Sequence, residues 1–232
     1  MQEGAEQRKL WIVLGDIHEE IERFASIPEL AGAEGVIVTG DITQDGGPEA
    51  AARVMDVIKA RNTRIFAQIG NMDRAGVNTW LDEQRWNLHA RMLPLQEDVA
   101  LIGVGASVPT PFNTPSEFSE EQYAAWLDAA WQEARRYPRV VLVSHNPPRD
   151  TVCDAIGNGM HVGSTAVRAF IESAQPDICL CGHIHEARGV DAIGRTVVLN
   201  PGNFGAGGYA VLERRGDALT ARLCQLPARE GV

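Results

Sequence analysis

The chain has 232 residues, of which 44% are hydrophobic and 22% charged, ordinary values for a globular protein with one large core. Its 31 acidic residues outnumber its 21 basic residues and give a net charge of −10. This excess argues against stable nucleic-acid binding, which needs a basic face. It does not exclude a phosphate-bearing substrate, because metal ions can hold such a group.

The four cysteines and the N-terminal segment indicate the compartment. The cysteines lack the paired Cys-x-x-Cys spacing of a zinc knuckle, so we predict buried, reduced thiols. Residues 1–9 are polar, and no apolar run approaches the ~18 residues of a membrane span. We therefore expect a soluble protein in the cytoplasm, with no membrane partner.

The first three predicted strands share one pattern. Apolar runs at residues 10–14, 35–39 and 64–69 predict buried strands, and each is followed by a glycine and a polar residue. Helices are expected after the first two strands, at residues 19–24 and 48–60. This alternation predicts an α/β protein whose chemistry lies at the carboxyl ends of its strands.

The middle of the chain is less regular. Residues 78–91 are expected to be helical and residues 99–104 to form a strand. The segment 105–118 holds three prolines and predicts a long loop, which in a compact domain is usually functional or disordered. Ser119 and Gln122 then form a capping box at the start of a helix.

The last part of the chain predicts further strands at residues 140–143 and 178–181. Between them, Ser164 caps a helix that runs to about residue 174. Short apolar segments between residues 188 and 223 alternate with glycine turns and predict an antiparallel run. We find no domain boundary or repeat, so residues 1–232 are expected to form a single domain.

Polar side chains stand at the ends of five predicted strands. They are Asp16, His18, Asp41, Asn71, His145, His183 and His185. Residues i and i+2 of an extended segment point the same way, so the imidazole rings of His183 and His185 can point into one small volume. Carboxylate, amide and imidazole ligands suit Mn, Fe, Ni or Zn. Because seven ligands are too many for one ion with open positions, we predict two divalent ions that share a carboxylate.

Each of these motifs has an ordinary alternative when it stands alone. A Gly-Asp pair at a strand end is often a turn, and a His-x-His pair is more often surface or core histidine than a ligand. Their joint occurrence, each at the end of an apolar strand, favours the metal site.

In this order the motifs resemble those of the calcineurin-like metallophosphoesterase superfamily. The matching segments are Gly15-Asp16-Ile17-His18, Gly40-Asp41, Gly70-Asn71-Met72-Asp73, Ser144-His145 and Gly182-His183-Ile184-His185. The resemblance covers residue 10 to about 213. It implies a two-sheet mixed β-sandwich flanked by helices (αββα), with a core at about residues 10–226. It also implies that Asp16, His18 and His185 bind one ion. Asn71, His145 and His183 would bind the other, with Asp41 bridging.

The resemblance implies a metal-dependent phosphoester hydrolase, and we expect a phosphodiesterase that acts on a small phosphoester or a nucleotide. A hydroxide shared by the two ions would attack phosphorus in line. Asp41 and Asn71 would stand at the reacting centre. Asp73 is either a carboxylate that orients a ligand or a plain turn carboxylate.

Two departures from the family pattern affect the mechanism. Ser144 replaces a glycine, and Met72 replaces the histidine that the family places near the leaving-group oxygen. A thioether cannot donate a proton, and some bacterial and archaeal members also lack this histidine. His161 is a candidate for the missing acid, although a plain solvent-exposed histidine is the alternative.

The long loop supplies candidates for substrate binding. Phe112 is able to stack on a ring, and Asn113 to form a hydrogen bond with a polar group, although a surface loop without a role is the alternative.

Two other functions are possible for a chain with this pattern. A non-catalytic scaffold on the same fold fits less well, because all seven ligand positions are filled. A Rossmann-like or flavodoxin-like nucleotide binder lacks its G-x-G-x-x-G turn here.

Overall fold

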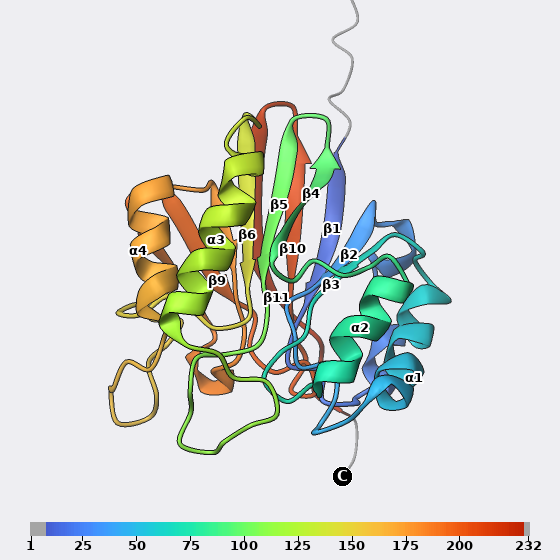
Figure 1. The fold of residues 1–232 in the computed structure, drawn as a ribbon. Coiled ribbons are helices and arrows are strands. Elements are labelled where there is room, and N and C mark those ends of the chain that lie inside the picture. The colour runs from blue at the N-terminus through green and yellow to red at the C-terminus, as the bar shows by residue number, and fades with distance from the viewer. Residues whose placement is uncertain (1–7, 230–232) are drawn as a thin grey trace, which may run out of the picture.

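The computed structural model describes residues 8–229, so most of the polar N-terminal segment lies outside it. Within the described residues, strands form two mixed sheets (Figure 1). In spatial order the first sheet contains β11 (Ala218–Gln225), β10 (Gly208–Arg215), β1 (Lys9–Leu14), β2 (Gly35–Val38) and β3 (Ile65–Ala67). The second contains β4 (Arg91–Gln96), β5 (Val99–Val104), β6 (Arg139–Ser144), β7 (Ile178–Leu180), β9 (Thr196–Asn200) and β8 (Gly189–Ile193).

Each sheet has a parallel centre. Strands β1, β2 and β3 run parallel in the first sheet, and β5, β6, β7 and β9 run parallel in the second. Their carboxyl ends lie at the lower edge in Figure 1, where two long loops, residues 105–118 and 149–163, also project. The groups that follow the strands therefore meet at this one edge.

Helices cover the outer face of each sheet (Figure 1). On the first sheet these are α1 (Pro48–Lys59) and α2 (Ala75–Glu83), and on the second α3 (Glu120–Ala134) and α4 (Thr165–Ala174). Alternation along the strands explains the layers. Trp11 belongs to the apolar cluster between the sheets, with Leu101. Its neighbour Ile12 belongs to the cluster with Met55 of α1. The αββα fold class is confirmed.

The two predicted helix caps are present. The Ser119 hydroxyl accepts a hydrogen bond from the Gln122 backbone N–H at the start of α3. The Ser164 hydroxyl accepts one from the Val167 backbone N–H at the start of α4. Both hydroxyls satisfy a helix N–H that has no partner inside the helix.

The helix predicted at residues 19–24 was wrong. His18 and Glu19 have φ angles of 47° and 65°, in the left-handed region, so a right-handed helix cannot include them. The Glu19 N–H instead donates to the Ile42 carbonyl. Only the short 3-10 helices η1 (Glu22–Ser26) and η2 (Leu30–Gly32) follow in this part of the described chain.

The prediction for residues 78–91 was also wrong in its bounds. Helix α2 begins earlier and ends at Glu83, and Arg85 has a φ of 61°. Strand β4 was missed because Pro94 interrupts its apolar pattern. Proline removes a backbone donor, which is tolerated here because β4 is the edge strand of its sheet.

The C-terminal strands do not form one antiparallel run. They form two antiparallel hairpins, β8 with β9 and β10 with β11, and the hairpins belong to different sheets. The local pattern of turns and apolar residues cannot distinguish these arrangements.

In the described residues, no helix is both long and apolar enough to cross a membrane. All four cysteines are buried free thiols.

Candidate metal centre

The first group of predicted ligands comes from both sheets. Asp16 and His18 follow β1, and His185 follows β7, yet one ligand atom from each lies within 4.8 Å of the others. The Nε2 atoms of His18 and His185 are 3.1 Å apart. His185 Nε2 is also 3.5 Å from Asp16 Oδ1. Three potential ligand atoms thus converge on one small volume.

The second group also combines the two sheets. Asp41 follows β2, while His145 and His183 come from the second sheet, and their ligand atoms again lie within 4.8 Å of one another. The Asn71 amide oxygen is 3.0 Å from His145 Nε2 and 2.7 Å from His183 Nδ1. It therefore lies beside both histidines of this group.

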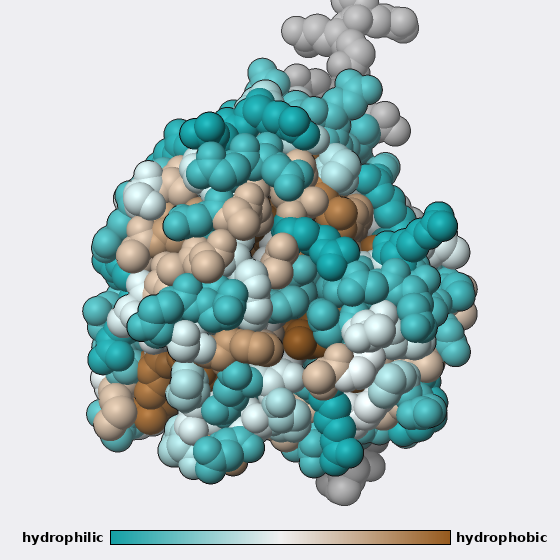
Figure 2. All heavy atoms as spheres, viewed as in Figure 1, coloured by the Kyte–Doolittle hydropathy of each residue, from teal (hydrophilic) through white to brown (hydrophobic). Residues whose placement is uncertain are grey.

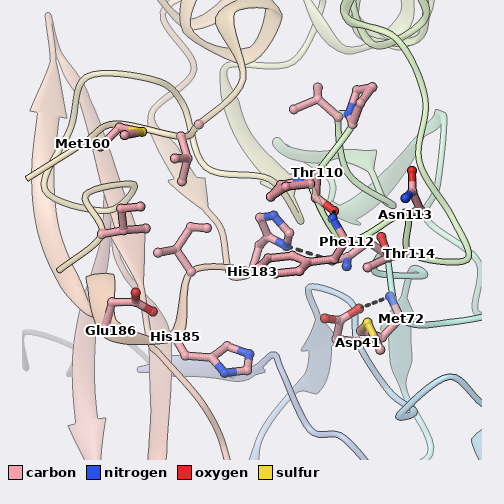
Figure 3. Close-up of a pocket in the computed structure, with 18 of the residues that line it drawn as sticks. Asp41, Met72, Thr110, Phe112, Asn113, Thr114, Met160, His183, His185 and Glu186 are labelled. Atoms are coloured by element: carbon pink, nitrogen blue, oxygen red, sulfur yellow. Dashed lines mark hydrogen bonds between the residues drawn. The ribbon is translucent and has the colours of Figure 1, made fainter. Parts of the chain in front are cut away.

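Asp41 lies between the two groups. Its Oδ2 atom is 3.5 Å from His145 Nε2 and 3.7 Å from His18 Nε2. Figure 3 shows Asp41 in the same pocket as His183 and His185, with a hydrogen bond from the Met72 backbone N–H to its carboxylate. This is the geometry that a bridging carboxylate needs.

The ligand residues have unusual backbone conformations. Asp16, His18, Asp41 and His183 all have φ angles between 47° and 69°. Such angles are uncommon outside glycine, carry a conformational cost and cluster at functional sites. The strand-end geometry therefore turns these side chains away from the strand direction and towards one another.

The glycines of the motifs allow the ligand loops to pack tightly. A Cβ atom on Gly70 would lie 2.0 Å from Asp41 Oδ1, and one on Gly40 would lie 2.6 Å from His145 Nδ1. Both distances are far below contact distance, so a side chain at either position would displace a predicted ligand.

Asp73 connects two of these loops. Its buried carboxylate accepts hydrogen bonds from the backbone N–H groups of Ile42, Thr43 and Gly70. These bonds join the Asp41 loop to the Asn71 loop. Burial, together with the negative charge of Asp41, raises the pKa of Asp73 to about 6. Of the two interpretations left open by the sequence, the geometry favours a carboxylate that positions ligand loops.

Gln68 was missed by the sequence analysis. Its fully buried side-chain Nε2 lies 3.2 Å from the Thr39 carbonyl, 3.1 Å from that of Val104 and 3.2 Å from that of Val143. These carbonyls lie at the ends of strands in both sheets. A glutamine inside an apolar strand was the available signal, because buried amides need hydrogen-bond partners.

The electrostatics of the second group favour a cation. Burial alone would raise the pKa of Asp41, but the neighbouring His145 lowers it to about 2. Burial would likewise lower the pKa of His145, but the Asp41 carboxylate raises it to about 9. A proton on His145 thus supplies positive charge at this point. The mixed oxygen and nitrogen ligands and this demand for positive charge both fit divalent metal ions.

A cleft of about 1370 Å³ opens over the ligands. The two projecting loops line it, and Phe112, Asn113 and His161 all contribute to its walls. Met72 lines the cleft beside Asp41 (Figure 3). The roles proposed for these side chains from the sequence stay predictions, but all of these residues line the same cleft.

His161 has a partner that the sequence did not reveal. Its Nδ1 atom lies 2.7 Å from Oδ1 of the fully buried Asp154. Asp154 also accepts hydrogen bonds from the backbone N–H groups of Thr151 and Gly163. This hydrogen bond to the carboxylate raises the pKa of His161. Nothing in the spacing of these residues marks them as a pair, because the contact depends on how the loop folds.

Comparison with known proteins places this site in a family. A family model described as calcineurin-like phosphoesterase matches residues 11–187, more than half of the chain. MJ1162, an uncharacterised protein of Methanocaldococcus jannaschii, is 34% identical over 175 residues, which cover 73% of this chain and 77% of that protein. The chain therefore belongs to the calcineurin-like phosphoesterase family.

Solved structures show the same fold at low sequence identity. TT1561 of Thermus thermophilus has a TM-score of 0.71 at 16% identity, covering 93% of this chain and 99% of that chain. A dimetal phosphatase of Danio rerio has a TM-score of 0.63 at 13% identity, covering 93% of this chain and 95% of that chain. Family membership and the two groups of candidate ligands support metal-dependent hydrolysis of small phosphoesters.

Proposed function

We propose that this protein is a phosphodiesterase that uses two divalent metal ions. One observation carries the proposal: seven potential ligands from five strand ends, Asn71 among them, gather into two groups that meet at Asp41. A turn or core role for the separate motifs does not account for this convergence. We also propose that residues 1–232 form one domain, with its core at about residues 10–226, because the site draws on both sheets. The buried free thiols support a reducing, cytoplasmic location.

The ligand groups divide between the two ions. Asp16, His18 and His185 would hold the first, and Asn71, His145 and His183 the second, with Asp41 shared. The oxygen and nitrogen donors suit Mn, Fe, Ni or Zn. When bound, such ions lower the pKa of a water molecule and neutralise negative charge on the phosphoryl oxygens. Asp73 positions the loops that carry Asp41 and Asn71, and Phe112 and Asn113 contact the organic part of the substrate.

An alkoxide leaving group needs a proton that Met72 cannot supply. We assign this role to His161, because it lines the cleft and its Nδ1 is occupied by Asp154. The opposite ring nitrogen, Nε2, is then the one that carries a proton to a leaving oxygen. The raised pKa of His161 keeps more of the side chain protonated near neutral pH.

A screen of phosphoesters against metal ions tests the function. Purified protein is incubated with bis(p-nitrophenyl) phosphate or p-nitrophenyl phosphate, each with Mn, Ni, Zn, Mg or a chelator. We expect turnover of the diester that depends on added metal and stops with the chelator. Metal binding without turnover of either ester would favour the scaffold function instead.

A series of aryl and alkyl diesters tests the acid. If His161 donates the proton, the rate depends weakly on leaving-group acidity in the wild type, and His161→Ala steepens the dependence. If the site has no acid, the wild-type dependence is already steep and Met72→His flattens it. A slope that neither substitution changes would exclude both accounts. The comparison requires that the chemical step limits the rate.

A further inference from the structure

The two most exposed large apolar side chains in the described residues both belong to the cleft. Phe112, on the loop 105–118, is 81% exposed, and Met160, on the loop 149–163, is 55% exposed. In Figure 3 they lie on opposite sides of the pocket, with the Phe112 ring extending into it. Figure 2 shows a hydrophobic patch at the lower left, over the loop 149–163, on a largely hydrophilic face. Covering exposed apolar surface of this kind with a ligand is favourable, because it removes the surface from water.

Hydrogen bonds hold the Phe112 loop in place. The Glu117 carboxylate accepts from the Thr110 hydroxyl at 2.6 Å and from the Thr114 backbone N–H at 2.8 Å, on either side of the tip. At the base, the Ser116 N–H donates to the carbonyl of Asn71, a predicted metal ligand. The position of Phe112 is therefore tied to the metal centre.

Hydrogen bonds also fix the Met160 side of the cleft. The Ile156 N–H donates to the Met160 carbonyl, and the Met160 N–H donates to the Asn158 side chain at 3.0 Å. Next to this turn, Ala155 pairs with His161 in an isolated bridge. Both apolar side chains thus project from preorganised loops, which lowers the entropy cost of binding a ligand between them.

The charges of the cleft limit which ligand it accepts. Among the described residues that line it, Arg149 is the one lysine or arginine, whereas Asp45, Glu120 and Glu186 are acidic. A second phosphate would therefore meet repulsion and little positive charge beyond the metal centre. The cleft volume of about 1370 Å³ is also larger than a phosphoryl group alone requires.

We propose that Phe112 and Met160 contact opposite faces of an uncharged ring in the substrate. The substrate class is then a phosphodiester with a single phosphoryl group and a ring, such as a nucleoside base, in the part that stays bonded to phosphorus when the leaving group departs. Aromatic rings and the polarisable methionine sulfur both contact ring faces and edges favourably. This inference rests on the proposed phosphodiesterase function and specifies its substrate.

Esters that share one leaving group test the inference. Thymidine 5′-(p-nitrophenyl phosphate) and methyl p-nitrophenyl phosphate both release p-nitrophenolate, which needs no proton from the protein. Their ratio of kcat/KM therefore reports on the ring. We expect the wild type to prefer the thymidine ester by about tenfold or more. A 3′-phosphate added to the thymidine ester should lower kcat/KM, because it brings a second anionic group into the cleft.

Single and double variants identify the two contacts. Phe112→Ala and Met160→Ala should each lower the ratio severalfold, while Phe112→Trp, which keeps a ring, should retain it. Val190→Ala is the matched control, because Val190 is 50% exposed on β8 and does not line the cleft. Because both side chains contact one ring, Phe112→Ala and Met160→Ala should show coupling with the thymidine ester and none with the methyl ester.

The possible outcomes separate this inference from the proposed function. If the wild type hydrolyses neither ester with any metal, the phosphodiesterase function itself fails. If it hydrolyses both at similar kcat/KM, the function stands and the ring site is overturned. A preference for the thymidine ester that Phe112→Ala and Met160→Ala leave intact would also overturn the assignment of these two residues.

Discussion

The metal centre and the loops above it are built in different ways. The predicted ligands follow strands, and most are buried and held by backbone hydrogen bonds between loops, as around Asp73. The cleft loops 105–118 and 149–163 contain no helix or strand longer than a single bridge in the described chain, and they expose Phe112 and Met160. Under the proposed function, the strand ends would carry the chemistry and the loops would carry the choice of substrate.

The largest effect is expected at the residue shared by both ligand groups. Asp41→Ala should lower metal-dependent hydrolysis by about a thousandfold or more, because both ions would lose a ligand. His185→Ala, which removes a ligand of one ion, should cost less. Activity and bound metal are measured together, with circular dichroism to check folding. Full activity and two bound metal ions in Asp41→Ala would refute the assignment of the centre.

A smaller loss is expected when the support of the ligand loops is changed. Asp73→Asn replaces one acceptor oxygen by a donor, so the backbone N–H groups of Ile42, Thr43 and Gly70 lose part of their shared partner. We expect metal affinity or activity to fall by about 10- to 100-fold. Asp128→Asn, on the exposed face of α3, is the matched control. Equal behaviour of the two variants would show that Asp73 is a plain turn residue.

The stability of the protein should depend on pH through His89, which lies at the base of the loop 105–118. His89 Nδ1 accepts a hydrogen bond from the Gly105 N–H at 3.0 Å, and burial lowers the pKa of His89 from 6.5 to about 4. Protonation therefore favours the unfolded chain, so stability falls as the pH drops from 6.5 towards 4. Between pH 7 and pH 5 this contributes a loss of about 2 kcal/mol in the free energy of unfolding.

Urea unfolding of the wild type and of His89→Gln at both pH values measures this contribution. The glutamine is able to accept the same N–H but does not titrate. The difference in stability between the two proteins should therefore change by about 2 kcal/mol from pH 7 to pH 5. A difference that stays constant across this range would contradict the buried, neutral state of His89.

The smallest effect on stability is expected at the loop tip. Glu117→Ala removes the acceptor shared by Thr110 and Thr114 in a part of the chain near the surface. The free energy of unfolding should fall by about 1 kcal/mol or less. Proteolysis within residues 110–114 should nevertheless become faster, because local opening no longer breaks these bonds. A cleavage rate equal to that of the wild type would show that Glu117 does not hold the tip.

The same comparison explains what could be predicted from the sequence. The candidate ligands could be named because each stands at the end of an apolar strand and, apart from His145, in a motif that begins with a glycine, which are local signals. Gln68 and Asp154 could not, because the groups that give them a role lie on other strands or depend on the fold of a loop. Strand β4 was missed because Pro94 is acceptable only at an edge, and edge position is a property of the whole sheet.

The Gln68 amide affects how stable the protein is before it binds metal ions. Its hydrogen bonds join the end of β2 to the ends of β5 and β6, so they connect the two sheets even when no metal ion is bound. We therefore expect the ion-free protein to remain folded, with an unchanged circular dichroism spectrum after chelation. Metal ions would be held by residues from both sheets and would therefore add a second link between them. Their addition should raise the melting temperature of the protein.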